Sequence, residues 1–410
     1  MTKTGSSALF LGLALTGCTR TNKSEAAAAD TTAVIAEWSE ARLSAIEIDS
    51  ARYEDSWRVA PSVDSLLTAD SMAHRLPPDS IVIPEKWEDI GKSDSGVSRV
   101  PSIQLPLGGQ AGGPSVLYAQ ILLDRSPFSP GVIDGKWGKN TEKAVFWLQR
   151  QEGIPATGQI DSVTFRSLVD LAGAPEQYVM TVVLTAEDVA GPFQILPEDV
   201  YERAKLECLC YETLAEKLAE KYHVTEEVLA QMNPGAQLNG LGAGDSLSVP
   251  NIEHPAATKG TASGIARLIV SDQGRYVHAL DSTGKILQHF PSTLGSSFYP
   301  SPEGQLEVVR ITRNPWFHWQ PKLLENVPDT KKPARLPPGP NSPVGVVWIA
   351  LSKEHFGIHG TNEPATIGYA TSSGCIRLTN WDARLLAELI DKGTSVEFRD
   401  LAAGRVVAGR

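Results

Sequence analysis

The sequence predicts a multidomain α+β protein, and three observations lead to this fold class. The chain has 410 residues, enough for two to three domains of ordinary size. Helix-like spacing of apolar residues is confined to two short segments in the middle of the chain. The C-terminal third instead shows strand-like runs separated by turns that contain Gly and Asp. Small helical modules therefore precede a mostly β domain.

Composition excludes several classes of protein. Hydrophobic residues make up 41% and charged residues 21%, which argues against a wholly disordered or membrane-embedded chain. The formal net charge of -11 argues against binding to nucleic acid, which requires a basic footprint. Four cysteines are too few for a disulfide scaffold. We expect no cofactor and no metal site.

Residues 1–18 predict a signal peptide for export. The apolar run Ala8–Leu15 is too short to span about 30 Å of hydrocarbon as a helix. Leu15–Cys18 resembles a bacterial lipobox, which implies that Cys18 is lipidated and becomes the mature N-terminus. Thr19 after it resembles the outer-membrane class. We therefore expect a periplasmic, lipid-anchored protein of the cell envelope; the alternative is an ordinary signal peptide in which Cys18 is incidental.

Residues 19–114 predict an acidic tether that is largely disordered. Acidic residues outnumber Lys and Arg by 15 to 9 in residues 19–100, and a Gly- and Pro-rich string follows at 106–114. The tether can contain helical pieces around residues 35–50, and a small helical domain of unknown role is the alternative.

Residues 115–173 predict a compact helical unit. Asp161 can cap a helix with one apolar face, and an earlier helix can begin at Asn140 or Thr141. The turn at 131–138, with the helices on either side, resembles the three-helix peptidoglycan-binding domain. A neutral structural role is the alternative.

Residues 174–210 are expected to connect this unit to a second module at 211–252. There Thr225 can cap the second of two short helices, and the segment ends in a strand. This pattern resembles the LysM fold, βααβ, which recognises N-acetylglucosamine in glycan chains. Tyr211–Thr213 replaces the usual Gly-Asp before the first helix, so sugar binding stays open.

Cys208 and Cys210 lie just before this module. Residues i and i+2 of a strand are about 6–7 Å apart, at the limit of disulfide geometry, and no other Cys or cluster of His is near in sequence to complete a metal site. We interpret them as a pair of buried free cysteines.

Residues 264–400 predict the mostly β domain. Two hairpins are expected over residues 266–290, and a buried strand over 344–351. Residues 316–340 form a strand-free insertion, either a lid over the cleft or a solvated loop. Thr379 or Asn380 can cap a helix that packs on the core.

The chemistry of this domain lies in His359-Gly360-Thr361-Asn362 and in Ser372-Ser373-Gly374-Cys375-Ile376-Arg377. A cysteine nucleophile needs a neighbouring base and donors for the oxyanion that forms at the attacked carbonyl. His359 offers the base, and the Gly360 carbonyl can fix its tautomer. The amides of Ser373, Gly374 and Cys375 can form an oxyanion hole.

These strings resemble the catalytic motif of the L,D-transpeptidases of the YkuD type, and Ser301–Gly304 and Pro337–Asn341 resemble flanking loops of that family. The resemblance implies that Cys375 is the nucleophile, that His359 transfers the proton and that Gly360 orients the imidazole. Ser373 stands where many members have His, which leaves His359 as the local base.

Arg377, Ser372 and Asn362 are the expected substrate-binding residues. Arg377 follows Cys375 by two positions, so both side chains point the same way on an extended segment, and it can hold a stem-peptide carboxylate. A structural salt bridge is the alternative for Arg377.

The resemblance implies a peptidoglycan L,D-transpeptidase that forms an acyl-enzyme with a tetrapeptide stem and releases D-Ala. The acyl group then passes to an amine, which makes 3→3 cross-links or links a protein to the wall. The expected partners are stem peptides, glycan, the membrane through the lipid anchor, and an amine-bearing acceptor protein. The alternatives are a carboxypeptidase or endopeptidase with water as acceptor, and a catalytically silent wall-binding tether.

Overall fold

The computed structural model describes residues 103–252, 264–297, 299–324, 327–328 and 330–399. All of them belong to one compact unit of the chain, 61–410. The predicted signal peptide, its Cys18 and most of the predicted tether lie outside the described residues. No helix in the described part is long and apolar enough to cross a membrane.

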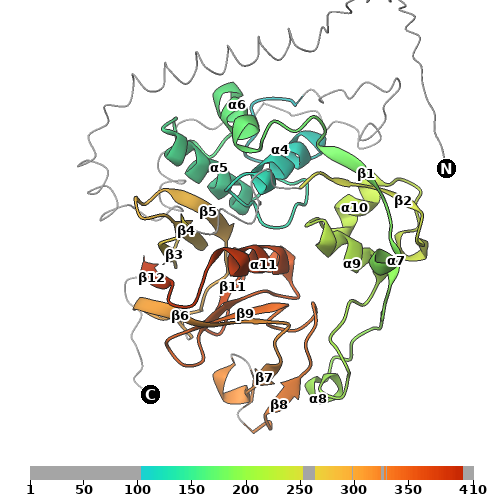
Figure 1. Cartoon of the computed structure of the whole chain (residues 1–410), viewed down its shortest axis with the longest axis vertical. Helices are drawn as coiled ribbons and strands as arrows, with labels where there is room; N and C mark the ends of the chain where they lie inside the picture. Colours follow the sequence, from blue (N-terminus) through green and yellow to red (C-terminus); the bar gives the residue numbers. More distant parts are fainter. Residues whose placement is uncertain (1–102, 253–263, 298, 325–326, 329, 400–410) are drawn as a thin grey trace, which may run out of the picture. The chain divides into compact units, whose positions relative to one another are not determined.

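The first module is a bundle of three helices, as the sequence predicts (Figure 1). They are α4 (Pro114–Arg125), α5 (Lys139–Glu152) and α6 (Ser162–Leu171). The predicted cap of α6 is confirmed, because the Asp161 side chain accepts hydrogen bonds from the amides of Val163 and Thr164. Helix α5 begins one residue earlier than predicted, after Gly138, which offers no side-chain cap.

The predicted end of the tether at residue 114 is wrong. Leu107 is fully buried and exchanges two backbone hydrogen bonds of 2.9 Å with Ile160, and Trp137 donates to the carbonyl of Ala111. Residues 107–113 therefore pack as part of the helical module. The Gly- and Pro-rich composition suggested a linker, but the apolar side chains of Leu107 and Ala111 are buried in the core of the helical module.

We name the second module the βααβ module after its two strands and its two longest helices, and its first strand lies outside the predicted bounds of 211–252. Strand β1 (Val179–Val183) pairs antiparallel with β2 (Ser246–Pro250). Between them lie α7 (Ala186–Val189), α8 (Val200–Arg203), α9 (Leu214–Lys221), α10 (Glu226–Met232) and the short helix η3 (Leu238–Gly240). The predicted Thr225 cap of α10 is confirmed. Part of the predicted connecting segment 174–210 thus supplies a strand of the module.

The interpretation of Cys208 and Cys210 as free and buried is wrong. Both are half-buried, and they form a disulfide with their Cα atoms 5.2 Å apart. The backbone between them is not a flat strand, so the Cα separation falls below the strand value and into the range that a disulfide bridges.

The third module is a curled eight-stranded sheet in the order β11-β10-β9-β6-β12-β3-β4-β5. Its strands are β3 (Arg267–Ser271), β4 (Tyr276–Leu280), β5 (Ile286–Pro291), β6 (Gly304–Arg313), β9 (Val347–Leu351), β10 (Gly357–His359), β11 (Ile376–Arg377) and β12 (Ser395–Arg399). The predicted hairpins are confirmed as β3, β4 and β5. Thr293, which follows β5, bridges Arg377 of β11, so the two ends of the sheet meet.

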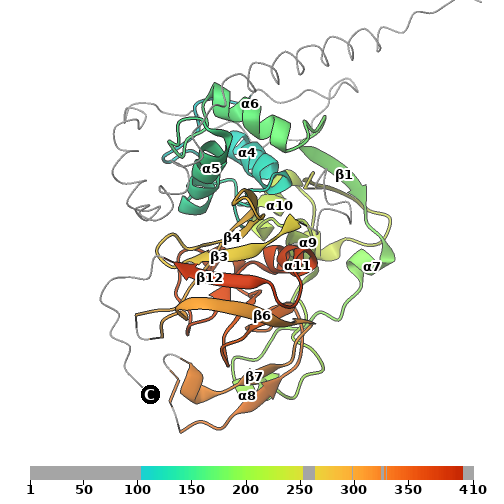
Figure 2. The ribbon, with the colours of Figure 1, turned by 60° about the vertical axis from the view of Figure 1, so that its left-hand side comes forward.

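Helix α11 (Asn380–Leu389) packs on β9 and β10 and closes the core of the sheet (Figures 1 and 2). Thr379 is its N-cap. Ala383, Leu386 and Ala387 are buried apolar residues of the helix, and Ile390, which directly follows it, is buried as well. The helix stops at Leu389, three residues before the predicted Lys392-Gly393 stop.

The predicted strand-free insertion 316–340 contains two strands and the short helix η5 (Pro321–Leu323). Strands β7 (Phe317–Trp319) and β8 (Ala334–Leu336) form an antiparallel pair. Leu336 is buried with Leu196 and Leu209, which come from the segment between β1 and α9. The insertion is therefore anchored where Pro321, Leu336 and Pro337 are buried, while most of its other described residues are exposed.

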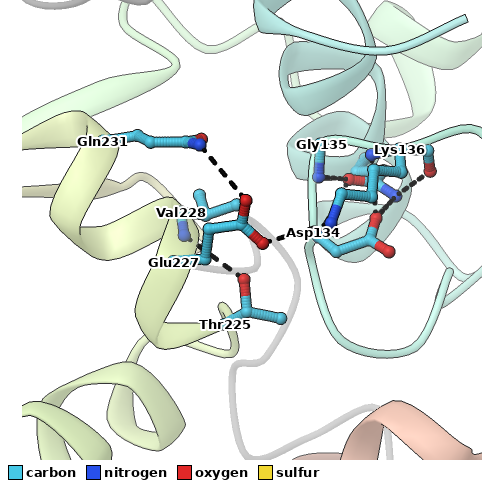
Figure 3. Close-up of polar contacts among 8 residues, drawn as sticks. Asp134, Gly135, Lys136, Thr225, Glu227, Val228 and Gln231 are labelled. Carbon is cyan, nitrogen blue, oxygen red and sulfur yellow. Dashed lines mark hydrogen bonds and ion pairs between the residues drawn. The ribbon is translucent and has the colours of Figure 1, made fainter.

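The two helical modules share one core that reaches strands β3 to β5, and the core between the sheet and α11 is a separate cluster. Buried residues of α4 and α5 join those of α9 and α10 and reach Ile269 and Tyr276 in the sheet. The amide of Ser129 donates to the carbonyl of His289, which covers the edge strand β5. At the surface, the turn that holds Lys136 faces Glu227 of α10 across the junction (Figure 3).

Candidate active site

Strand register places His359 and Arg377 on one face of the sheet. Strands β10 and β11 run parallel, with Ile358 opposite Ile376 and His359 opposite Arg377. Both isoleucines are fully buried in the core. Because side chains alternate along a strand, His359 and Arg377 lie on the opposite face. Cys375 directly precedes β11, and the charge of Arg377 acts on both the His359 imidazole and the Cys375 thiol.

The imidazole of His359 is held in one orientation. Its Nδ1 lies 2.6 Å from the Gly360 carbonyl, which can only accept, so Nδ1 donates the hydrogen and Nε2 is left as an acceptor. The Trp348 ring stacks on the imidazole at 5.3 Å. His359 is only 4% exposed; burial, followed by the charge of Arg377, lowers its pKa to about 3. The resting imidazole is therefore neutral.

The thiol of Cys375 is also neutral at rest. Burial raises its pKa to about 11, against the opposing effects of the Gly357 backbone and of Arg377. The thiol donates a hydrogen bond of 3.5 Å to the carbonyl of His355. With a neutral thiol and a neutral imidazole, no thiolate is formed in advance, so a proton must leave the sulfur as it attacks.

Ser372 organises the turn that leads to Cys375. Its buried hydroxyl donates to the Cys375 carbonyl at 2.6 Å and accepts from the Gly374 amide at 3.2 Å. The hydroxyl is therefore used within the turn, and the role of Ser372 in substrate binding stays a prediction. The Gly374 amide is likewise engaged within the turn, and its role as an oxyanion donor stays a prediction. The amides of Ser373 and Cys375 stay as predicted oxyanion donors.

Gly374 has a geometric reason to be glycine. Its φ is +104°, and a Cβ at this position would lie 2.9 Å from the Phe356 ring. Gly360 is similarly constrained, since a Cβ there would lie 2.1 Å from the side-chain oxygen of Asn380. Both glycines of the motif permit close packing around the two predicted catalytic residues.

Arg377 is half-buried and available for a ligand. Its Nε is buried without a hydrogen-bond partner, and no carboxylate of the described residues forms an ion pair with it. Burial lowers its pKa, while Glu363 and Cys375 act in the opposite direction. Since Arg377 forms no ion pair among the described residues, the structure does not support the alternative of a structural salt bridge.

Asn362 is part of a pocket to which Cys375, His359 and Arg377 do not contribute. The pocket, of about 470 Å³, lies between the βααβ module and the sheet and is also lined by Glu216, Glu220, Asn341 and Asn380. The role of Asn362 in substrate binding stays a prediction.

Sequence reasoning missed Trp348, Phe356 and the main chain of His355. None of the three carries a local signal, because strand pairing and loop closure bring them to the site from other segments. No group of three or more His, Cys, Asp or Glu in the described part of the chain could hold a metal ion.

Comparison with known proteins shows which families this chain resembles. The family model of the L,D-transpeptidase catalytic domain matches residues 266–398, and that of a peptidoglycan binding domain matches residues 112–168. The chain is 32% identical over 185 residues to the L,D-transpeptidase YkuD of Bacillus licheniformis, covering 45% of this chain and 92% of that protein. It is 30% identical over 179 residues to the YkuD of Bacillus subtilis, covering 44% and 89%.

Among solved structures, the L,D-transpeptidase from Xylanimonas cellulosilytica aligns with a TM-score of 0.33 and 13% identity. The alignment covers 73% of this chain and 100% of that chain.

Proposed function

The chain belongs to the YkuD family of L,D-transpeptidases, cysteine-based transferases of peptidoglycan, and from this premise we propose that Cys375 is its nucleophile and His359 its proton-transfer group. The observation that supports the assignment is the register of β10 and β11, which sets His359 opposite Arg377, together with the electrostatic interaction of Arg377 with both His359 and Cys375. Cys375 is also the free cysteine of the described residues, since Cys208 and Cys210 are bonded to each other.

The first half-reaction takes the acyl group from a tetrapeptide stem. The sulfur of Cys375 attacks the carbonyl carbon at the L-centre of diaminopimelate, and the thiol proton passes to Nε2 of His359. The amides of Ser373 and Cys375 receive the oxyanion. The C–N bond to D-Ala then breaks, the leaving amine takes the proton from His359, and a thioester remains on Cys375.

The second half-reaction restores the enzyme. An acceptor amine attacks the thioester carbon and gives its proton to His359, which returns it to the leaving sulfur of Cys375. A diaminopimelate side chain as acceptor gives a 3→3 cross-link, and a lysine gives a protein–wall link. The guanidinium of Arg377, with its unpartnered Nε, holds a carboxylate of the stem.

The remaining parts of the chain serve to bring the enzyme to its substrate. The peptidoglycan binding domain at 112–168 supports a peptidoglycan substrate. In the second module, the order β1-α9-α10-β2 supports a LysM-like unit that binds glycan. Lipidation of Cys18 places the protein in the periplasm, anchored to the outer membrane; the lipobox-like sequence supports this part of the proposal.

Acylation by a carbapenem tests the assignment of the nucleophile. The purified chain should gain the mass of one carbapenem on Cys375, and Cys375→Ser should gain none. Incubation with a disaccharide-tetrapeptide should release D-Ala and yield a cross-linked product. No mass gain on the wild type at any pH, with the fold intact, would favour a catalytically silent tether. Water as acceptor would instead give a tripeptide without cross-links.

A further inference from the structure

His223 occupies a position where its residue type is unexpected. Helix α9 ends in a Schellman motif, in which the His223 amide donates to Glu220 and the Val224 amide donates to Ala219. His223 has a φ of +52°, and glycine is the usual residue there because a Cβ is strained. A non-glycine residue at a strained position suggests that its side chain has a role.

The imidazole of His223 joins all three modules. Its Nδ1 lies 2.8 Å from Oδ1 of Asp124 in α4, and its Nε2 lies 3.2 Å from Oγ1 of Thr379, the N-cap of α11. It stacks on the ring of Trp381 at 5.3 Å with an interplanar angle of 16°. His223 is 3% exposed and Asp124 is 2% exposed, so solvent does not screen the pair.

Buried negative charge surrounds the imidazole. Asp382 is fully buried; its Oδ1 accepts from the Ser129 hydroxyl at 2.8 Å. The Oδ2 atoms of Asp124 and Asp382 are buried without hydrogen-bond partners among the described residues. Two buried carboxylates are costly unless a cation compensates them, and His223 is the group placed to do so.

The contact with Thr379 leads directly to the proposed active site. Thr379 follows Arg377 by two residues, and its hydroxyl accepts from the Asp382 amide at 3.0 Å to begin α11. Leu378, between them, donates to the carbonyl of His359 at 2.8 Å. A displacement of Thr379 therefore moves the strand that carries Arg377 and, through it, the position of Cys375.

We propose that His223, as an imidazolium paired with Asp124, is a positioning residue for the transpeptidase reaction: it holds Thr379 and so fixes β11 and the start of α11. This inference rests on the proposed function of Cys375. A residue of the βααβ module thus sets the geometry of the catalytic sheet, and α4 supplies its counter-ion.

The charged form of His223 depends on pH in a defined direction. Burial acts to lower its pKa, but Asp124, then Asp382 and Glu220, outweigh burial and raise the pKa above its ordinary value. Glu220, on α9 itself, also contacts Arg384 of α11. For a raised histidine pKa, the stabilisation is fully present below pH 6.5 and is lost as pH rises through the raised value.

The rate of carbapenem acylation, measured from about pH 5 to pH 9, tests the proposal with Asp124→Asn and His223→Gln in the full chain. At pH 7 both variants should acylate at least about tenfold more slowly than the wild type. In Asp124→Asn the ratio to wild type should recover on acidification, because the imidazole takes up its proton again. In His223→Gln the ratio should stay low across the range.

Lys136→Ala provides the matched control. Like Asp124→Asn, it removes a contact between the three-helix module and the βααβ module. Its ion pair with Glu227 is exposed, however, with side chains 66% and 60% accessible (Figure 3). Its acylation rate should equal that of the wild type.

Three results would overturn the proposal. Wild-type rates in both variants at pH 7 would remove any role, and an equal loss at every pH in Asp124→Asn would show a merely structural one. NMR titration of ¹³C-labelled histidine in the wild type needs no variant to fold. A His223 that is neutral at pH 7 in this titration would overturn the proposal. Absence of acylation in the wild type itself would refute the proposed function instead.

Discussion

Gly374→Ala tests the geometry of the turn that precedes Cys375. Two separate costs follow from the structure. A side chain at a φ of +104° is strained by roughly 1–3 kcal/mol. The added Cβ would also lie 2.9 Å from the Phe356 ring and 3.2 Å from the Pro300 carbonyl, and such overpacking costs about 1–3 kcal/mol. Together the variant should lose roughly 2–6 kcal/mol of unfolding free energy.

Gly393→Ala separates the two costs. Gly393 lies in the same sheet domain with a φ of +92°, and a Cβ added there would meet nothing within 4 Å. It should therefore lose only the backbone part, roughly 1–3 kcal/mol. Phe356→Ala in the Gly374→Ala background should restore the packing part, which a double-mutant cycle measures as a coupling energy of about 1–3 kcal/mol.

Activity should divide the two glycine variants more sharply than stability does. Relief of the overlap moves the turn, and a shift on the order of 1 Å at a reacting group costs about 10²-fold in rate. Gly374→Ala should lose at least that factor in acylation, while Gly393→Ala should keep the wild-type rate. Urea unfolding and intact-mass acylation give the two readouts. If Gly374→Ala matched Gly393→Ala in both, the close packing around the turn would have no consequence and the reasoning would fail.

Three further predictions concern the catalytic pair and the anchor. His359→Ala should slow acylation at least about 10²-fold, whereas Ser373→Ala should be mild because its amide survives; intact mass measures both, and a His359→Ala rate within a few-fold of wild type would contradict the assignment. Alkylation of resting Cys375 by iodoacetamide should be slow at pH 8 and rise with pH toward its pKa of about 11, since burial disfavours the thiolate; a plateau near pH 7 would disprove a neutral resting thiol. Cys18→Ala should prevent lipidation and leave the protein soluble or unprocessed, and unchanged membrane fractionation with normal cleavage would rule out the lipobox.

Local features of the sequence predicted much of the fold correctly. Asp161, Thr225 and Thr379 cap their helices, because a cap depends on a side chain and amides two or three residues away. The hairpins of β3, β4 and β5 also follow from short turns and alternation. The catalytic strings His359-Gly360 and Ser372–Arg377 are local for the same reason, so the amino-acid sequence alone is enough to indicate the family.

What the sequence left undecided depends on segments far apart in the chain. Strand β1 pairs with β2, which lies at the other end of the βααβ module in sequence. The backbone at Cys208 and Cys210 bends so that the two residues form a disulfide. The turn places the hydroxyl of Ser372 between Cys375 and Gly374. His223 has no motif at all, and only the packing of three modules brings Asp124 and Thr379 to its two nitrogens. By itself the sequence determined which residues are chemically able to act; tertiary structure decided their protonation and orientation, because burial and long-range contacts set both.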